Sequence, residues 1–239
     1  MLHSNLILAL IFLLTGCKES STKERILFTT HFKIFYTPLD DNNVQEIADS
    51  LEKSYPRITT HLQSGELPMV NVQLYVDGAA LNKANPNIPS WAVGLATSVS
   101  QIHIVSPNNT QQDYQNMIRN IIHEFAHCVS MKINPTIANN PRWLWETVAD
   151  YEGNLPWDPK MLQYLVDQNP PSFNELNQFS NTRIYEVGHF IGQYIQDSKG
   201  GAGFKALILN NGNVRETFGL SDEEFTKAWF EFVKKKYGI

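Results

Sequence analysis

The sequence HEFAH at positions 123–127 determines how the rest of the chain is interpreted. Two histidines four positions apart on a helix project from the same face, one turn above the other, so their ring nitrogens can bind one metal ion. Zinc is the usual ion in such a site, where it keeps one position open for water. Glu124 lies beside that position and can accept a proton from the water. The spacing therefore predicts a metal centre with a carboxylate base.

The residues around the motif favour a helix that begins at Tyr114. Apolar side chains recur at helical spacing and predict one buried stripe. The stripe contains Tyr114, Met117, Ile118, Ile121, Ile122, Phe125, Cys128 and Val129. Asn109 or Thr110 is the predicted cap. His123 and His127 fall outside the stripe and continue a polar row that two asparagines begin, so we expect them to face a cleft rather than the core.

A second helix, predicted at positions 141–153, supplies a candidate third ligand. It starts with a proline, ends with a glycine and has Asn140 as its predicted cap. Glu146 and Asp150 are four positions apart and share a face. A solvated helix face is the plain interpretation of such a pair. Glu146, however, stands in an otherwise apolar run, where an unpaired carboxylate is costly and a metal ion would offset that cost.

This pair of helices resembles the arrangement in gluzincin metallopeptidases, where HExxH on one helix is followed by the glutamate and aspartate of ExxxD on the next. Glu146 lies nineteen residues after His127, and Asp150 follows four residues later. The run from Trp143 to Tyr151 is similar in particular to the peptidase MA-like domains of that group. Thr147 is a departure, since those domains often carry glycine after the glutamate.

The resemblance implies zinc as the cofactor, with one ion per chain held by His123, His127 and Glu146. It makes Glu124 the catalytic base that receives a proton from the attacking water. Asp150 becomes the partner of a ligand histidine, because a metal-bound imidazole needs its other ring N–H held to fix its tautomer and orientation.

The resemblance also implies a zincin-like α+β fold for residues 26–239, with the metal cleft between two lobes. The amino-terminal lobe, residues 26–133, is a small sheet-and-helix unit, and the carboxy-terminal lobe, residues 134–239, is mainly helical. Alternating apolar residues predict strands at His31 to Thr37, Val70 to Val76 and Ser98 to Val105. The other predicted helices are Asp41 to Leu62, which Pro56 kinks or divides, Pro159 to Val166, Arg183 to Gln196, Phe204 to Leu209 and Asp222 to Lys236.

In gluzincins the strand before the motif helix is the sheet edge that lines the cleft. The resemblance therefore makes Trp91 to Val105 the candidate for binding an extended peptide as an added strand. The segment from Tyr185 to Tyr194 resembles the helix behind the glutamate helix, and its two glycines allow close approach. A donor opposite the metal would stabilise the negative charge that develops on the carbonyl oxygen. Tyr185 is the first candidate and His189 the second, with a packing or surface role as the alternative for each.

The amino terminus predicts export and lipid attachment. Residues 1–16 contain no charged side chain, and Leu6 to Leu14 is an apolar run too short to span a bilayer but typical of a signal peptide. The run ends in LTGC, which resembles the bacterial lipobox and implies cleavage before Cys17 and lipidation of that residue. Residues 17–25 then read as a solvated tether. We expect a lipid-anchored protein of the bacterial cell envelope, facing the periplasm or the exterior, with an ordinary signal peptide or a short membrane anchor as the alternative.

Charge and cysteine content exclude other classes of function. The net charge is −5 and no basic run appears, so nucleic acid is not an expected partner. With Cys17 lipidated, Cys128 is the remaining cysteine and no disulfide is expected. Cys128 falls on the apolar stripe, which indicates a small buried hydrophobe. His103 has no second ligand at helical spacing and is predicted to be an exposed strand histidine.

Together these expectations describe a membrane-anchored zinc-dependent peptidase acting on peptides or proteins, without a predicted oligomeric state. The alternative is a non-catalytic lipoprotein of the same fold that serves as a peptide-binding or adhesive module. Fold alone does not separate the two, but a binding module has no need of Glu124. A third interpretation is an accidental motif on a helical packing face, which predicts no bound metal.

Overall fold

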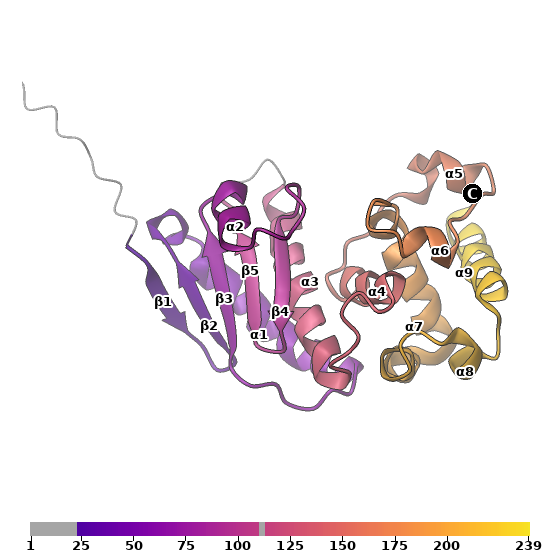
Figure 1. Ribbon diagram of the computed structural model, residues 1–239, viewed down its shortest axis with the longest axis horizontal. Coiled ribbons are helices and arrows are strands. Elements are labelled where there is room, and N and C mark those ends of the chain that lie inside the picture. The colour runs from indigo at the N-terminus through magenta and orange to yellow at the C-terminus, as the bar shows by residue number, and fades with distance from the viewer. Residues whose placement is uncertain (1–22, 110–112) are drawn as a thin grey trace, which may run out of the picture.

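The computed structural model describes residues 23–109 and 113–239 (Figure 1). The predicted signal peptide, Cys17, most of the predicted tether and the candidate cap Thr110 lie outside the described residues. The tether prediction extends three residues, 23–25, into the described part, and the last of them, Arg25, already begins the first strand. None of the helices in the described ranges is both long and apolar enough to cross a membrane.

One five-stranded mixed sheet forms the amino-terminal half of the molecule, in the order β1-β2-β3-β5-β4. The strands are β1 Arg25–Phe28, β2 Phe32–Tyr36, β3 Val70–Tyr75, β4 Gly94–Ser98 and β5 Gln101–Val105. The three central strands run parallel to one another, and β1 and β4 are antiparallel edges. The predicted strands at His31 to Thr37 and Val70 to Val76 are confirmed as β2 and β3.

Helices α1 Val44–His61 and α3 Tyr114–Ile133 pack on one face of this sheet (Figure 1). Three rings join the layers: Phe125 of α3 lies 5.2 Å from Phe32 of β2 and 5.6 Å from Tyr55 of α1 between ring centroids. Alternate residues of the strands point toward the helices and are buried, as the sequence pattern predicts. This packing fixes the motif helix against a rigid support.

The segment from Trp91 to Val105, the candidate for peptide binding, contains the predicted strand at Ser98 to Val105, found as β5, and a further strand, β4, that was not predicted. It folds into a hairpin, in which β4 pairs with β5 and β5 pairs on its other side with β3. The strand directly before α3 is therefore internal, and the edge is β4. The physical reason is that Ile102 and Ile104 of β5 are fully buried under α3, which favours a central position for that strand.

The carboxy-terminal half is helical, as predicted, with α4 at its boundary with the sheet half (Figure 1). Its helices are α4 Arg142–Glu152, α5 Gln163–Val166, α6 Phe173–Leu176, α7 Ile184–Leu209, α8 Val214–Phe218 and α9 Asp222–Tyr237. Helix α4 packs between α3 and α7. Aromatic rings fill the space behind it, where Trp143 stacks on Phe173 with centroids 4.1 Å apart. The chain is thus an α+β protein in which α4 connects the two halves.

Several predicted boundaries are wrong for local reasons. Helix α1 continues through Pro56 without division, because that proline lies on the exposed side, where water can satisfy the freed carbonyl. The predicted division between Arg183 to Gln196 and Phe204 to Leu209 is confirmed, because α7 consists of two helices that meet at a kink at Gly200, where φ is 59° and ψ is −161°. Pro159 to Val166 divides into a short 3-10 helix and α5. The short helix α2, Gly78–Ala84, and the edge strands β1 and β4 were not predicted.

The caps of α3 and α4 also differ from prediction. Asp113 rather than Asn109 caps α3, and its carboxylate accepts a hydrogen bond from the backbone N–H of Asn116 at 3.0 Å. Pro141 rather than Asn140 occupies the cap position of α4, without a side-chain hydrogen bond. The proline cannot donate a backbone hydrogen bond, which makes it suitable for the start of a helix.

Candidate metal centre

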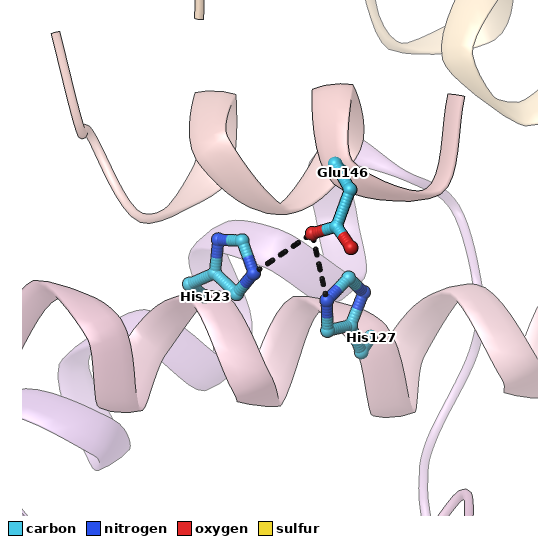
Figure 2. Close-up of side chains that lie close together, drawn as sticks. All are labelled: His123, His127 and Glu146. Atoms are coloured by element: carbon cyan, nitrogen blue, oxygen red, sulfur yellow. Dashed lines mark ion pairs between the residues drawn. The ribbon is translucent and has the colours of Figure 1, made fainter. Parts of the chain in front are cut away.

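His123 and His127 of α3 and Glu146 of α4 lie together between the two helices (Figure 2). Oε2 of Glu146 is 3.3 Å from Nε2 of His123 and 3.6 Å from Nε2 of His127. The three ligand atoms lie within 4.8 Å of one another, and the residues are 6, 4 and 6 % exposed. Helical spacing of four on α3 and close packing of α4 therefore bring three possible ligand atoms to one point.

Glycines allow α4 to approach its neighbours on both sides. A Cβ atom at Gly153 would lie 3.1 Å from Cβ of His123, at the point where α4 ends against α3. On the opposite side, a Cβ atom at Gly188 of α7 would lie 2.4 Å from Oδ2 of Asp150, and one at Gly192 would lie 2.5 Å from Cβ of Tyr151. The predicted close approach of α7 to the glutamate helix is confirmed, and it holds α4 against α3.

Asp150 contacts the ring nitrogen of His123 that faces away from Glu146. Its Oδ1 atom lies 3.0 Å from Nδ1 of His123. This contact holds the imidazole so that Nε2 points at the Glu146 carboxylate. Burial raises the pKa of Asp150 to about 7, and His123 opposes that rise. The predicted pairing of Asp150 with a histidine of the motif thus has the required geometry.

Glu124 lies between α3 and the edge strand β4. A Cβ atom at Gly94 would lie 2.9 Å from Oε1 of Glu124, and the backbone N–H of Ala96 donates to the carboxylate. Burial raises the pKa of Glu124 to about 7, while the charge on His123 lowers it and that on Glu146 raises it. A carboxyl group with that pKa exchanges a proton readily near neutral pH, which is the property of a general base or acid.

The three candidate ligands differ in their ionisation. Burial lowers the pKa of His127 to about 4, which keeps its imidazole neutral. Burial alone would raise the pKa of Glu146, but its contacts with His123 and His127 outweigh that effect and hold the pKa well below its usual range. The pKa of His123 is raised, because Asp150 and Glu146 outweigh the effect of burial. Glu146 and His127 are therefore in the forms that bind a metal ion, an ionised carboxylate and a neutral imidazole, whereas His123 has to release a proton when an ion binds.

The donor set fits a divalent cation, and zinc in particular. Three carboxyl groups, those of Glu124, Glu146 and Asp150, are buried in one cluster. Within residues 23–109 and 113–239, no lysine or arginine forms an ion pair with any of them. Burying such charges without compensation is costly, and a dication at this point would supply the compensation. Two imidazole nitrogens with one carboxylate oxygen form a ligand set typical of zinc in hydrolases.

Tyr185 and His189, the two candidate donors on α7, occupy different positions relative to this cluster. The Tyr185 hydroxyl donates a hydrogen bond to Oε1 of Glu146 at 3.2 Å, so this residue borders the ligand group. Burial raises the pKa of Tyr185 above its usual range and keeps the hydroxyl protonated. His189 is buried behind Asp150, where Nδ1 lies 3.3 Å from the Asp150 backbone carbonyl oxygen. Only Tyr185 of this pair directly contacts a candidate ligand.

Two tryptophans near the centre were not singled out as site residues from the sequence. The indole of Trp145 stacks on the His127 ring with centroids 3.8 Å apart and planes 7° apart, which fixes the orientation of that imidazole. Trp91, in the loop before β4, lies edge-on to Tyr185 with centroids 6.0 Å apart. Trp145 could have been recognised, since it directly precedes Glu146. Trp91 is brought to the site only by the tertiary fold.

Cys128 has the structural role expected of it, whereas His103 is not the exposed strand histidine that was predicted. Cys128 is fully buried, and burial raises the pKa of its thiol. His103, on β5, is partly buried and forms a hydrogen bond between Nδ1 and the hydroxyl of Tyr75 at 2.9 Å. In the described part of the chain, the group suited to hold a metal ion consists of His123, His127 and Glu146.

Comparison with known proteins does not place this chain in a family. No family model matches the sequence. No curated protein matches it either. The proposals below therefore depend on the residues of this chain and their geometry.

Proposed function

We propose that this chain is a zinc-dependent peptidase of the gluzincin type. The observation that carries the proposal is that Glu124 shares one buried cluster with His123, His127 and Glu146. The three ligand atoms lie within 4.8 Å of one another, and the Glu124 carboxyl group has a pKa of about 7. A packing interface would gain nothing from burying three carboxyl groups at one point.

Each side chain has a distinct part in the proposed reaction. His123, His127 and Glu146 would hold the ion, which when bound supplies Lewis-acid activation of water and of the substrate carbonyl. Glu124 accepts the proton of the attacking water and later delivers it to the leaving nitrogen. Asp150 and Trp145 hold the two imidazoles in position. The buried setting strengthens these electrostatic effects, because the surrounding dielectric constant is low.

The edge strand β4 supports a peptide as the substrate. It pairs with β5 on one side, while its other edge has no partner strand in the described sheet. Its residues Gly94 and Ala96 also border the Glu124 carboxylate. An extended peptide added to this free edge would form backbone hydrogen bonds with β4 and bring one of its peptide bonds next to Glu124.

The proposed location is the bacterial cell envelope, with the protein attached to a membrane by lipid at Cys17. The sequence LTGC after an apolar run of signal-peptide length supports this proposal. The attached lipid would place the peptidase on the periplasmic or extracellular side. Radiolabelled fatty acid incorporated into the wild-type protein but absent from Cys17→Ala would test it, and equal labelling of both proteins would refute it.

Substitution of Glu124 tests the enzymatic proposal. Glu124→Ala and Glu124→Gln are expected to retain one zinc ion per chain while losing cleavage of a mixed peptide library. Glu66→Gln, which changes an exposed glutamate away from the cluster, is the matched control and is expected to behave as wild type. Equal cleavage by wild type and the Glu124 variants would exclude the mechanism. Bound zinc without cleavage by wild type would favour the alternative of a binding module.

A further inference from the structure

An exposed tryptophan borders the proposed active site without a packing partner on its outer face. Trp91 is 53 % exposed, and the ring contact that it makes within the described residues is with Tyr185, at 6.0 Å and 75°. Tyr185 in turn donates to Oε1 of Glu146. One aromatic ring therefore separates Trp91 from a candidate metal ligand.

The backbone fixes Trp91 in this place. A turn closes around it, in which the N–H of Ala92 donates to the carbonyl of Pro89 at 3.0 Å. Two residues later, the carbonyl of Val93 accepts a hydrogen bond from Val105 of β5 at 2.8 Å. The exposure of the indole is thus a property of an ordered segment, and the ring is held at the surface beside the site.

An indole in this position has a clear preference for its contacts. Its large apolar face gains free energy when it is covered, and its ring packs well against other aromatic or bulky aliphatic groups. Gly94, three residues after Trp91, borders the Glu124 carboxylate. Three residues of extended chain span about 10 Å at most. A peptide paired with β4 would therefore carry a side chain past Trp91 within about three residues of the bond beside Glu124.

We propose that Trp91, together with the ring of Tyr185, forms a binding site for a bulky apolar side chain of the peptide substrate. This inference rests on the proposed peptidase function and specifies its substrate class. The preferred substrates carry phenylalanine, tyrosine, leucine or methionine within three residues of the cleaved bond. Peptides with only small or charged side chains in that window bind weakly, because they leave the indole uncovered.

The chain contains a matched control for Trp91. Trp157 is 51 % exposed and follows α4 in a loop. It has no ring contact with a residue of the metal centre in the part of the chain that the structure describes. Trp91→Ala and Trp157→Ala thus remove equally exposed indoles, one beside the site and one elsewhere.

The test separates binding from cleavage. Zinc-loaded Glu124→Gln protein is titrated calorimetrically with acetylated hexa-alanine and with a set of analogues. In each analogue phenylalanine replaces the alanine at a different position. We expect at least one phenylalanine analogue to bind about tenfold more tightly than hexa-alanine. Adding Trp91→Ala is expected to abolish the difference, Trp91→Phe to retain part of it, and Trp157→Ala to leave it unchanged.

A second measurement uses the active protein. Wild type is expected to cleave the phenylalanine peptides with a kcat/KM about tenfold above that of Trp91→Ala. If the binding preference for phenylalanine depends on Trp91 but the wild type cleaves no peptide, the proposed peptidase function is refuted. The proposed binding site at Trp91 is still supported in that case. Equal binding of all peptides to the Glu124→Gln protein, or a preference that survives Trp91→Ala, would overturn the inference.

Discussion

The Tyr185 hydroxyl bonds to Oε1 of Glu146, while Oε2 of the same carboxylate lies toward the Nε2 atoms of both histidines. The tyrosine therefore holds the carboxylate in the orientation in which it shares a point with the imidazoles. Tyr185→Phe is expected to lower zinc affinity about tenfold, the usual range for groups that orient a ligand. Titration against a competing chelator measures this loss.

A second tyrosine–glutamate pair, which joins α5 to α7, provides the control. The hydroxyl of Tyr164 donates to Oε2 of Glu186 at 2.7 Å, away from the metal centre. Tyr164→Phe is expected to leave zinc affinity unchanged. Tyr185→Phe could instead retain zinc affinity and lower kcat. That result would mean that the hydroxyl donates a hydrogen bond to the carbonyl oxygen of the substrate, the role for which the sequence made Tyr185 the first candidate.

Removal of the metal ion is expected to destabilise the whole protein. Three carboxyl groups lie buried at one point, and burial raises the pKa of two of them, Glu124 and Asp150, to about 7, so burying this cluster without a cation costs free energy. At a zinc concentration about 100 times Kd, binding adds about 2.7 kcal/mol to the free energy of unfolding. For a domain of this size that corresponds to a rise in Tm of roughly 5–10 °C.

Scanning calorimetry with and without a chelator measures the shift in Tm. His127→Ala lacks one ligand, so its Tm is expected to respond little to the chelator. A wild-type Tm that is the same in zinc and in chelator would mean that the cluster binds no metal. That result would favour the interpretation of the motif as an ordinary packing surface.

The sequence predicted the cluster of candidate ligand side chains well because its key distances are set within single helices. His123 and His127 are four apart on α3, and Glu146 and Asp150 are four apart on α4, so helical geometry alone aligns each pair. Burial of Glu146 in an apolar run then left few ways to satisfy its charge other than a partner on the facing helix. The ionisation states required knowledge of the surroundings, and only the structure supplies them.

The substrate-facing elements were predicted less well, since they depend on contacts between distant segments. Strand β4 contains glycine, alanine, threonine and serine, which have weak strand preference or short side chains. Its pairing becomes apparent only when the hairpin places β5 beside β3. The position of Trp91 beside Tyr185 likewise joins residues 94 positions apart in sequence. No local pattern contains that information.

The approach of α7 to α4 should be intolerant of any side chain at Gly188. A Cβ atom there would lie 2.4 Å from Oδ2 of Asp150, and a buried carboxylate has little room to move. Gly188→Ala is expected to lower the free energy of unfolding by about 2 kcal/mol. It should also weaken zinc binding, because Asp150 positions His123.

Urea denaturation of the zinc-loaded protein measures the first effect, and chelator competition measures the second. Gly78→Ala is the control, since a Cβ atom at that position meets nothing within 4 Å. A Gly188→Ala protein with normal stability would show that α7 can move away from α4 at little cost. If Gly188→Ala lowered the stability but left the zinc affinity normal, the position of Asp150 would not affect zinc binding by His123.

A further buried carboxylate, that of Glu152 of α4, contacts two residues of α1 and should make stability depend on pH. Its side chain is 0 % exposed, and it contacts Nδ1 of His61 at 2.5 Å and the Arg57 guanidinium at 2.6 Å. The hydrogen bond to Glu152 raises the pKa of His61, and burial opposes this effect. The imidazolium form is therefore bound more strongly in the folded protein than in the unfolded chain.

The sign of the pH effect follows from that raised pKa. Stabilisation by the protonated His61 is fully present below the unfolded pKa of about 6.5 and is lost as the pH rises through the higher folded pKa. The free energy of unfolding of zinc-loaded protein should therefore fall as the pH rises from about 6.5 through the folded pKa of His61, and His61→Gln should flatten that fall. Proton NMR titration should show a lower His61 pKa in Glu152→Gln. A pH dependence of stability unchanged by His61→Gln would mean that other groups produce it.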